Sequence, residues 1–461
     1  MSSFWRAVRD SLRGVEQDYT RLPMGRAILL LAIPMVLEMI MESLFAVVDI
    51  FWVSHLGPDA VAAVGLTESF LTLVAAVSIG LSMGTTAMVS RRVGEGDLEG
   101  AADTAVQAIG VALLTGLAVG VAGALLAPDL LRLMGASPSV IAGGRGYTAI
   151  LLGGCGTMVL LYLINAVFRG AGDPAISMRC LWLANLLNIL LGPFFIFGWG
   201  PFPRLGVAGA AVATTIGRGC GVLYQLYALR RHQGRVEIRR RHLRLQPGVM
   251  TRLLRISGPG IVQFLIATAS WLALVRIISL FGSDALAGYT ISIRVLIFAI
   301  MPSWGLCNAA ATLVGQNLGA GRPDRAERSV WQTGLYNMVF MALVTVFFLI
   351  WGEAVIGFFT SDPAVLRFGV QCMRIVSYGY IFYAWGMVMV QAFNGAGDTW
   401  TPTVINLLCY WVLQIPLAWA LARPLGFGTA GVFWAIFTAE SILAIAGMLV
   451  FRRGRWKTRR V

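Results

Sequence analysis

Charged residues are scarce in this chain. Of its 461 residues, only 13% are Asp, Glu, Lys or Arg, whereas 57% are hydrophobic. A soluble protein of this length needs roughly twice that share of charge to cover its surface. The apolar residues come in blocks of about 20–28, each long enough to cross a ~30 Å hydrocarbon core as a helix. The composition therefore excludes a soluble globular protein and predicts a polytopic membrane protein.

The motifs of several enzyme classes are also missing. The six cysteines stand singly in apolar stretches without CxxC or metal-ligand spacing, and the three histidines form no zinc motif. The spans hold no combination of His, Ser or metal ligands that could perform catalysis, and no P-loop is present to bind ATP. We therefore expect no metal, no cofactor and no enzymatic activity. The charge balance of +14 comes mostly from two arginine-rich patches that flank apolar spans, where arginine sets topology and contacts anionic lipid, so we expect no nucleic-acid partner.

The apolar blocks predict an all-α membrane protein with twelve transmembrane helices. The expected spans are roughly 27–54, 60–90, 104–127, 143–168, 176–199, 205–229, 254–281, 285–312, 329–351, 366–392, 401–423 and 427–451. They divide the chain into a polar N-terminal segment (1–26), an N-terminal lobe (27–229), a basic linker (230–253), a C-terminal lobe (254–451) and a basic tail (452–461). The N-terminal segment has no short apolar core and no small-residue cleavage site, so it is not expected to be a cleaved signal peptide.

Arginine is distributed unequally between the two sets of loops. One set includes Arg91, Arg169 and Arg322 together with the nine arginines of 230–255, and it shares its side with both tails. The other set carries only a few. By the positive-inside rule, both termini are expected to be cytoplasmic, in a multi-pass protein of the bacterial plasma (inner) membrane.

The two halves of the chain repeat each other at an offset of 225 residues. Pro34 matches Pro259, LGPDAVAA from Leu56 matches FGSDALAG from Phe281, and RGAGDP from Arg169 matches NGAGDT from Asn394. The register slips by three before GVAGAAVA at Gly206 meets GTAGVFWA at Gly428. Six spans per repeat give both halves one orientation and predict a pseudo-two-fold axis along the membrane normal. Two such six-helix bundles enclose a central cleft, which suits alternating access and needs only one chain, so we expect a monomer.

The first span carries three acids. Glu38 and Glu42 lie 40° apart at 100° per residue, and Glu42 and Asp49 lie within 20°, so one face holds three carboxylates over roughly 16 Å. Ionisable groups in a span are costly and mark function by default. This face must therefore line the cleft or the interior of the N-terminal lobe.

Asp49, about one and a half turns from the outer end of the span, is the strongest functional candidate of the three acids. Glu38 and Glu42 either attract cationic compounds, join a proton path or, for Glu38, reach cytoplasmic water. Glu68 in the second span and Glu440 in the twelfth are further cleft candidates, each open to a structural explanation by hydrogen bonding.

Other residues suggest a substrate cavity and a gate. Met39 in the first span and Met387 in the tenth are candidates for a pliable cavity that accepts amphipathic, cationic ligands, although methionine is common in any bundle. Arg276 and Arg294, in the outer third of the seventh and eighth spans, either snorkel to the surface or pair with acids of the N-terminal lobe when an outer gate closes.

Taken together, these motifs resemble the multidrug and toxic compound extrusion (MATE) family, within the group of multidrug, oligosaccharidyl-lipid and polysaccharide exporters. The resemblance rests on Pro34, Val48-Asp49 and Leu56-Gly57, on the GAGDP and NGAGDT loops, and on NILLGPFFIFGWG followed by LGVAGAAVAT. It covers nearly the whole chain. It implies twelve helices in two lobes and the exchange of a substrate for a cation.

The resemblance also implies a coupling site. Asp49 matches the family's cation-binding aspartate, and Asn188 and Thr214 match the asparagine and threonine of the sodium site in one branch. Gly192 replaces that branch's second aspartate, and Ala267 and Tyr383 stand where another branch has carboxylates. Sodium prefers hard oxygen ligands, so proton coupling is expected, and Glu42 as a substitute carboxylate keeps sodium open. Otherwise Asn188 and Thr214 are ordinary interhelical hydrogen-bonders.

We therefore expect an antiporter that exports small amphipathic, cationic compounds in exchange for protons, with sodium possible. Two other functions compete with this one. A flippase for lipid-linked saccharides would prefer a basic cleft and often two more spans. A membrane enzyme would need catalytic groups that the spans lack.

Overall fold

The computed structural model describes residues 3–231 and 233–459, and nearly all of them are helical. In chain order the first half comprises α1 (Ser3–Arg13), α2 (Met24–Ser54), α3 (Pro58–Glu95), α4 (Leu98–Leu125), α5 (Ala127–Leu133), α6 (Pro138–Gly153), α7 (Cys155–Ala171), α8 (Pro174–Phe197) and α9 (Val207–Arg230). A short 3₁₀ turn, η1 (Arg240–His242), lies in the linker.

The second half has the same plan. It comprises α10 (Pro247–Ser279), α11 (Ser283–Gly319), α12 (Pro323–Gly357), α13 (Pro363–Tyr378), α14 (Tyr380–Gly395), α15 (Trp400–Asn406), the π-helical η2 (Leu407–Gln414), α16 (Ile415–Ala422), α17 (Gly428–Arg452) and the 3₁₀ turn η3 (Arg455–Thr458). Eleven helices of the described residues are long and apolar enough to cross a membrane, and the bent pair α13–α14 makes a twelfth. The all-helical membrane architecture predicted from the sequence is confirmed, with eleven to twelve candidate spans among the described residues.

The repeat in the sequence becomes a repeat in local structure. Gly57 and Gly282 precede α3 and α11 with φ near +100°, a conformation that L side chains rarely adopt. Asp59 and Asp284 follow in the first turn of these two helices, where an acid stabilises the helix dipole. The fourth and tenth spans are each interrupted at a glycine, Gly154 and Gly379, which stand 225 residues apart.

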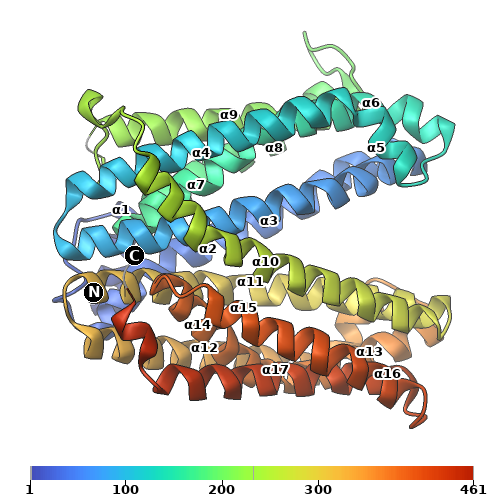
Figure 1. Ribbon diagram of the computed structural model, residues 1–461. Coiled ribbons are helices and arrows are strands. Elements are labelled where there is room, and N and C mark those ends of the chain that lie inside the picture. The colour runs from blue at the N-terminus through green and yellow to red at the C-terminus, as the bar shows by residue number, and fades with distance from the viewer. Residues whose placement is uncertain (1–2, 232, 460–461) are drawn as a thin grey trace.

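Two lobes face each other with their long helices roughly parallel (Figure 1). The N-lobe contains α2–α9 and the C-lobe α10–α17. The first long helix of each half packs against the second of the other half, so that α2 contacts α11 and α10 contacts α3. This exchange is what a two-fold relation between the halves requires. Both termini lie at the same end of the bundle, called the terminal end below; the other is the far end.

The lobes meet most closely toward the terminal end. A Cβ atom added at Gly84 would fall on Ser257 Oγ, and one at Gly315 would fall on Ser90 Oγ, so glycine is required for these approaches. Toward the far end, α3 inclines to the side of α6 and α10 to the side of α16, and the two lobes spread apart (Figure 1).

The helices extend beyond the spans expected from hydrophobicity. α3 covers Pro58–Glu95, where the expected span was 60–90, and α10 begins at Pro247, inside the basic linker expected at 230–253. The reason is that a hydrophobic run marks the part of a helix that lies in lipid, while the backbone can continue as a helix into water.

Candidate functional site

Asp49 lies on α2, about 8 Å inside the far end of that helix. It is partly buried, and it interacts electrostatically with Glu68 of α3 and with Arg218 of α9. Two acids and one base from three helices of the N-lobe therefore share one region. The structure places the predicted proton carrier inside this charged region of the N-lobe.

Asn188 and Thr214 form a direct pair. The Nδ2 atom of Asn188 donates to Thr214 Oγ1 at 2.6 Å, and the same hydroxyl donates to the carbonyl of Ala210 at 2.9 Å. Both side chains are buried. The two residues that the resemblance assigned to one site, from α8 and α9, thus come together in the fold.

Gly192, which replaces the family's second aspartate, lies beside α2. A Cβ atom at this position would sit 3.8 Å from Cδ1 of Trp52. The indole Nε1 of Trp52 is buried and has no hydrogen-bond partner among the described residues. An indole can donate a hydrogen bond but cannot serve as an oxygen ligand, so Trp52 does not replace the missing carboxylate.

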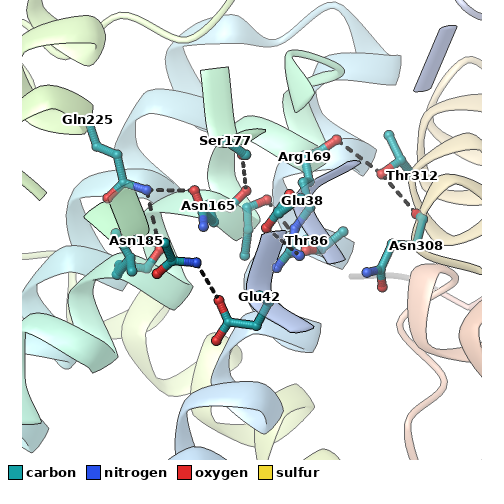
Figure 2. Close-up of polar contacts among 12 residues, drawn as sticks. Glu38, Glu42, Thr86, Asn165, Arg169, Ser177, Asn185, Gln225, Asn308 and Thr312 are labelled. Carbon is teal, nitrogen blue, oxygen red and sulfur yellow. Dashed lines mark hydrogen bonds and ion pairs between the residues drawn. The ribbon is translucent and has the colours of Figure 1, made fainter. Parts of the chain in front are cut away.

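Glu42 lies about 10 Å deeper along α2 than Asp49. Its Oε2 atom accepts a hydrogen bond from Asn185 Nδ2 at 3.2 Å (Figure 2). Asn185 is one turn from Asn188 on the same face of α8. The two amides of α8 therefore lie beside the acidic face of α2 at successive depths.

Glu38 lies deeper still and contacts a residue that the sequence analysis treated only as a topology marker. Its Oε1 atom is 3.5 Å from Nη1 of Arg169, the third-last residue of α7. Figure 2 shows the carboxylate and the guanidinium side by side, with Thr312 of the other lobe reaching the Arg169 carbonyl. Glu38 is 2% exposed, so it does not reach water, which was one of the options left open.

Glu68, a further cleft candidate, lies within electrostatic reach of the C-lobe. Glu68 on α3 is exposed and interacts electrostatically with Arg294, an exposed residue of α11. This is the kind of cross-lobe relation expected of a gating arginine. Arg276 is also exposed, and the described residues offer it no ion pair.

The other cleft candidates have different surroundings. Met39 is partly buried on α2. Met387 packs against the interior cluster of the C-lobe, where its sulfur accepts from Ser303 Oγ at 3.7 Å. Glu440 on α17 accepts from the Tyr410 hydroxyl at 3.2 Å, and its Oε2 atom is buried with no partner among the described residues. Tyr410 belongs to the π-helical η2, a distortion frequent at functional sites.

Two arginines were overlooked as site residues. Arg218 lies about 16 Å inside the far end of α9, one turn after Thr214. It interacts electrostatically with Asp49, Tyr147 and Tyr162. Arg218 could have been identified from the sequence, because a basic residue in the middle of a span is as costly as an acidic one. Arg169 could not be found this way, since it stands near the end of its span.

The loop after each half's fourth span buries an aspartate beside a basic segment. Asp173 is 6% exposed and accepts from the backbone N–H of Arg235, in the linker, at 2.7 Å. Burial raises the pKa of Asp173 from 3.8 to about 6, although the bond and charge of Arg235 act against that rise. Its repeat counterpart Asp398 is 3.3 Å from Nη2 of Arg459 in the C-terminal tail. Linker and tail thus play equivalent structural roles.

A two-lobed helical membrane protein with several acids inside the spans of one lobe has the organisation of a secondary transporter. The MatE family model matches residues 34–194 and again 259–420, once in each half. The chain therefore belongs to the MATE family of multidrug efflux transporters, which are not enzymes.

Individual relatives agree with this assignment. The chain is 30% identical to the probable multidrug resistance protein NorM of Pseudomonas aeruginosa, covering 95% of this chain and 90% of that protein. It is 26% identical to a protein of the same description from Thermotoga maritima, over 94% and 93% of the two chains. A solved outward-facing MATE transporter of the MOP superfamily superposes with a TM-score of 0.88, at 26% identity and 94% and 96% coverage.

Proposed function

We propose that this protein exports amphipathic, cationic compounds across the bacterial inner membrane in exchange for protons that bind at Asp49. The terminal end then faces the cytoplasm and the far end faces the outside. The observation that carries the proposal is that the acidic face of α2 turns into the N-lobe, where Glu42 contacts α8, Glu38 contacts α7, and Asp49 interacts with charges on α3 and α9.

Protons are favoured over sodium by the surroundings of Asp49. A sodium ion needs several oxygen ligands, yet Gly192 and Trp52 stand where the second carboxylate would be. A proton needs only one carboxylate oxygen.

The driving force depends on how many protons are exchanged. Exchange of one proton for one monovalent cation moves no net charge, so only the pH gradient contributes, ~1.4 kcal/mol or a tenfold substrate gradient per pH unit. A second proton would add its own ~1.4 kcal/mol and make the exchange electrogenic, with ~2.3 kcal/mol more per 100 mV. The pH gradient and the potential should therefore be imposed separately.

Ethidium efflux from liposomes that contain the purified protein tests the proposal. Wild type, Asp49→Asn and the control Asp59→Asn are compared under an imposed proton gradient and an imposed sodium gradient. Asp59 is an exposed acid in the first turn of α3. Proton-driven efflux that only Asp49→Asn loses is the expected result. Sodium-driven efflux would refute proton coupling, and no efflux under either gradient would favour a flippase for a lipid-linked compound.

A further inference from the structure

Glu38 has an incompletely satisfied carboxylate deep inside the protein. One oxygen, Oε1, lies 3.5 Å from Arg169 Nη1, and the other, Oε2, is buried without a hydrogen-bond partner among the described residues. A buried anion with an unsatisfied oxygen is costly. Protonation would remove that cost but would leave the Arg169 guanidinium without its counter-charge. The pair can therefore exist in two states, one ionic and one with a neutral acid, and each state carries its own cost.

The residue that pairs with Glu38 also holds the other lobe. Thr312 of α11 donates its hydroxyl to the carbonyl of Arg169 at 3.0 Å, and Gln316 donates Nε2 to the carbonyl of Gly170 at 3.0 Å. Both donors are buried. Figure 2 shows the first of these bonds beside the ion pair. The last turn of α7 is thus tied to Glu38 by a side chain and to the C-lobe by its backbone.

A third segment holds the same turn. The hydroxyl of Tyr19, in the segment before α2, donates to the carbonyl of Gly172 at 3.1 Å, and the Arg235 guanidinium lies 5.5 Å from the Tyr19 ring. Arg325 of the C-lobe donates to the Tyr19 carbonyl at 3.1 Å. Movement of the α7 turn would therefore loosen the bonds that Thr312, Gln316 and Tyr19 make to it.

We propose that Glu38 and Arg169 form a second protonation site, whose ion pair keeps the lobes together at the terminal end and whose protonation releases them. The proton binds a Glu38 oxygen, and the pair passes from neutral to singly positive. The unpaired guanidinium then moves toward water with the turn that carries it, and the bonds from Thr312 and Gln316 break. Return of the proton to the water at that end restores the pair.

Within the Glu38–Arg169 pair, Glu38 is the residue that gains or loses the proton. The titratable groups in electrostatic reach of it are Arg169, Glu42, Tyr162 and Cys180, from α7, α2 and α8. The facing residues of α11, Asn308 and Thr312, are neutral. Asp173, four residues after Arg169, has a pKa of about 6 and would titrate too. The distances are therefore measured in the Asp173→Asn background, where lobe separation at the terminal end should follow one protonation event.

Distance measurements between spin labels test this site without any drug. Labels at Leu98→Cys on α4 and Arg328→Cys on α12, both exposed at the terminal end, report the distance between the lobes. The protein is held in lipid nanodiscs at pH 8 and pH 6, with the half-buried Cys220 replaced by serine. Wild type should show a short distance at pH 8 and gain a longer one at pH 6. Glu38→Gln should show the longer distance at both pH values.

Matched variants make the result decisive. Asp59→Asn, which changes an exposed acid in the first turn of α3 at the far end, should behave as wild type. Thr312→Val, which removes a cross-lobe bond but leaves the ion pair, should open partly at pH 8 and still respond to pH. If Glu38→Gln fails to fold, Glu38→Asp can replace it. Its side chain is one methylene shorter, which increases the distance between the carboxylate and the Arg169 guanidinium, so the lobes should separate partly at pH 8.

A wild-type distance that does not change with pH, or a pH response that survives in Glu38→Gln, would overturn the inference. The role of the Glu38–Arg169 site in the transport cycle rests on the proposed function, but the pH-dependent separation of the lobes does not. If the distance responds to pH but no proton-driven efflux occurs, this site stands and the proposed coupling fails. If proton-driven efflux occurs but the distance does not respond to pH, the Glu38 site is ruled out and Asp49 stays the proposed coupling residue.

Discussion

Replacing Asp173 with asparagine should stabilise the folded protein at neutral pH. Asp173 is buried in the loop between α7 and α8, and burial raises its pKa from 3.8 to about 6. Above pH 6 the folded protein therefore has to hold a buried anion that the unfolded chain exposes to water. Asparagine keeps an oxygen that can accept from the Arg235 N–H, now at 2.7 Å, without that charge.

The size and pH range of the effect follow from the two pKa values. A rise from 3.8 to about 6 corresponds to ~3 kcal/mol of unfolding free energy. Between these values the folded state binds a proton that the unfolded state lacks, so wild-type stability rises as the pH falls. The advantage of Asp173→Asn should thus be ~3 kcal/mol above pH 6.5, shrink through pH 5 and vanish near pH 4.

Unfolding in mixed detergent–SDS micelles at several pH values measures this difference. The control is Asp398→Asn at the equivalent position of the other half, where the carboxylate accepts from Thr401 at 2.7 Å and pairs with Arg459 at 3.3 Å. That variant loses an ion pair with a partly exposed arginine and should be destabilised by about 1 kcal/mol. An Asp173→Asn variant that is less stable than wild type at pH 7.5, or a difference that does not vary with pH, would refute the reasoning.

Three further predictions concern the lobes and the coupling site. Gly315→Val places side-chain atoms on Ser90 Oγ, so it should lengthen the interlobe label distance at every pH, and Ser90→Gly in the same chain should partly reverse this. Thr214→Val removes the bond from Asn188; we expect ~0.6 kcal/mol lower stability but at least tenfold slower proton-driven efflux, with Thr214→Ser near wild type. Arg218→Gln removes the positive charge beside the N-lobe acids, so the pH of half-maximal efflux, measured from pH 6 to 9, should rise by about one unit, ~1.4 kcal/mol, while Arg218→Lys should not shift it.

The architecture could be predicted because it depends on two signals that are strong in a single sequence. Hydrophobic runs gave the spans, and the 225-residue offset gave the two lobes. The structure adds that Gly154 and Gly379 interrupt equivalent spans, with a bend of 57° at the second. These two glycines stand at equivalent positions of the repeat. A hydrophobic run, however, does not distinguish a glycine that bends a helix from one that lets two helices pack closely.

The site was only partly predictable for a different reason. The three acids of α2 could be assigned to one face because helical spacing fixes their angle. Their partners could not, because Asn185, Arg169 and Thr312 come from other helices, and contacts between helices depend on packing. The position of Arg169 near the end of its span also matched the positive-inside rule, so a topological explanation was sufficient until the structure placed its guanidinium against a buried carboxylate.

The two lobes are alike in backbone but differ in the charged residues of their spans. At the repeat offset, Glu38, Glu42 and Asp49 of α2 correspond to Gln263, Ala267 and Leu274 of α10, none of which is an acid.

Beyond the three-residue slip, Arg218 of α9 corresponds to Glu440 of α17. The N-lobe therefore surrounds one base with acids, whereas the equivalent position of the C-lobe is an acid bonded to Tyr410. The bond from Thr312 to Arg169 has no mirror image either, because the equivalent positions are Ala87 and Asn394 and alanine cannot donate. In the proposed mechanism, proton binding and its link to lobe closure both use these unsymmetrical residues. One lobe is therefore expected to bind the coupling ion while the other serves as the surface against which it closes.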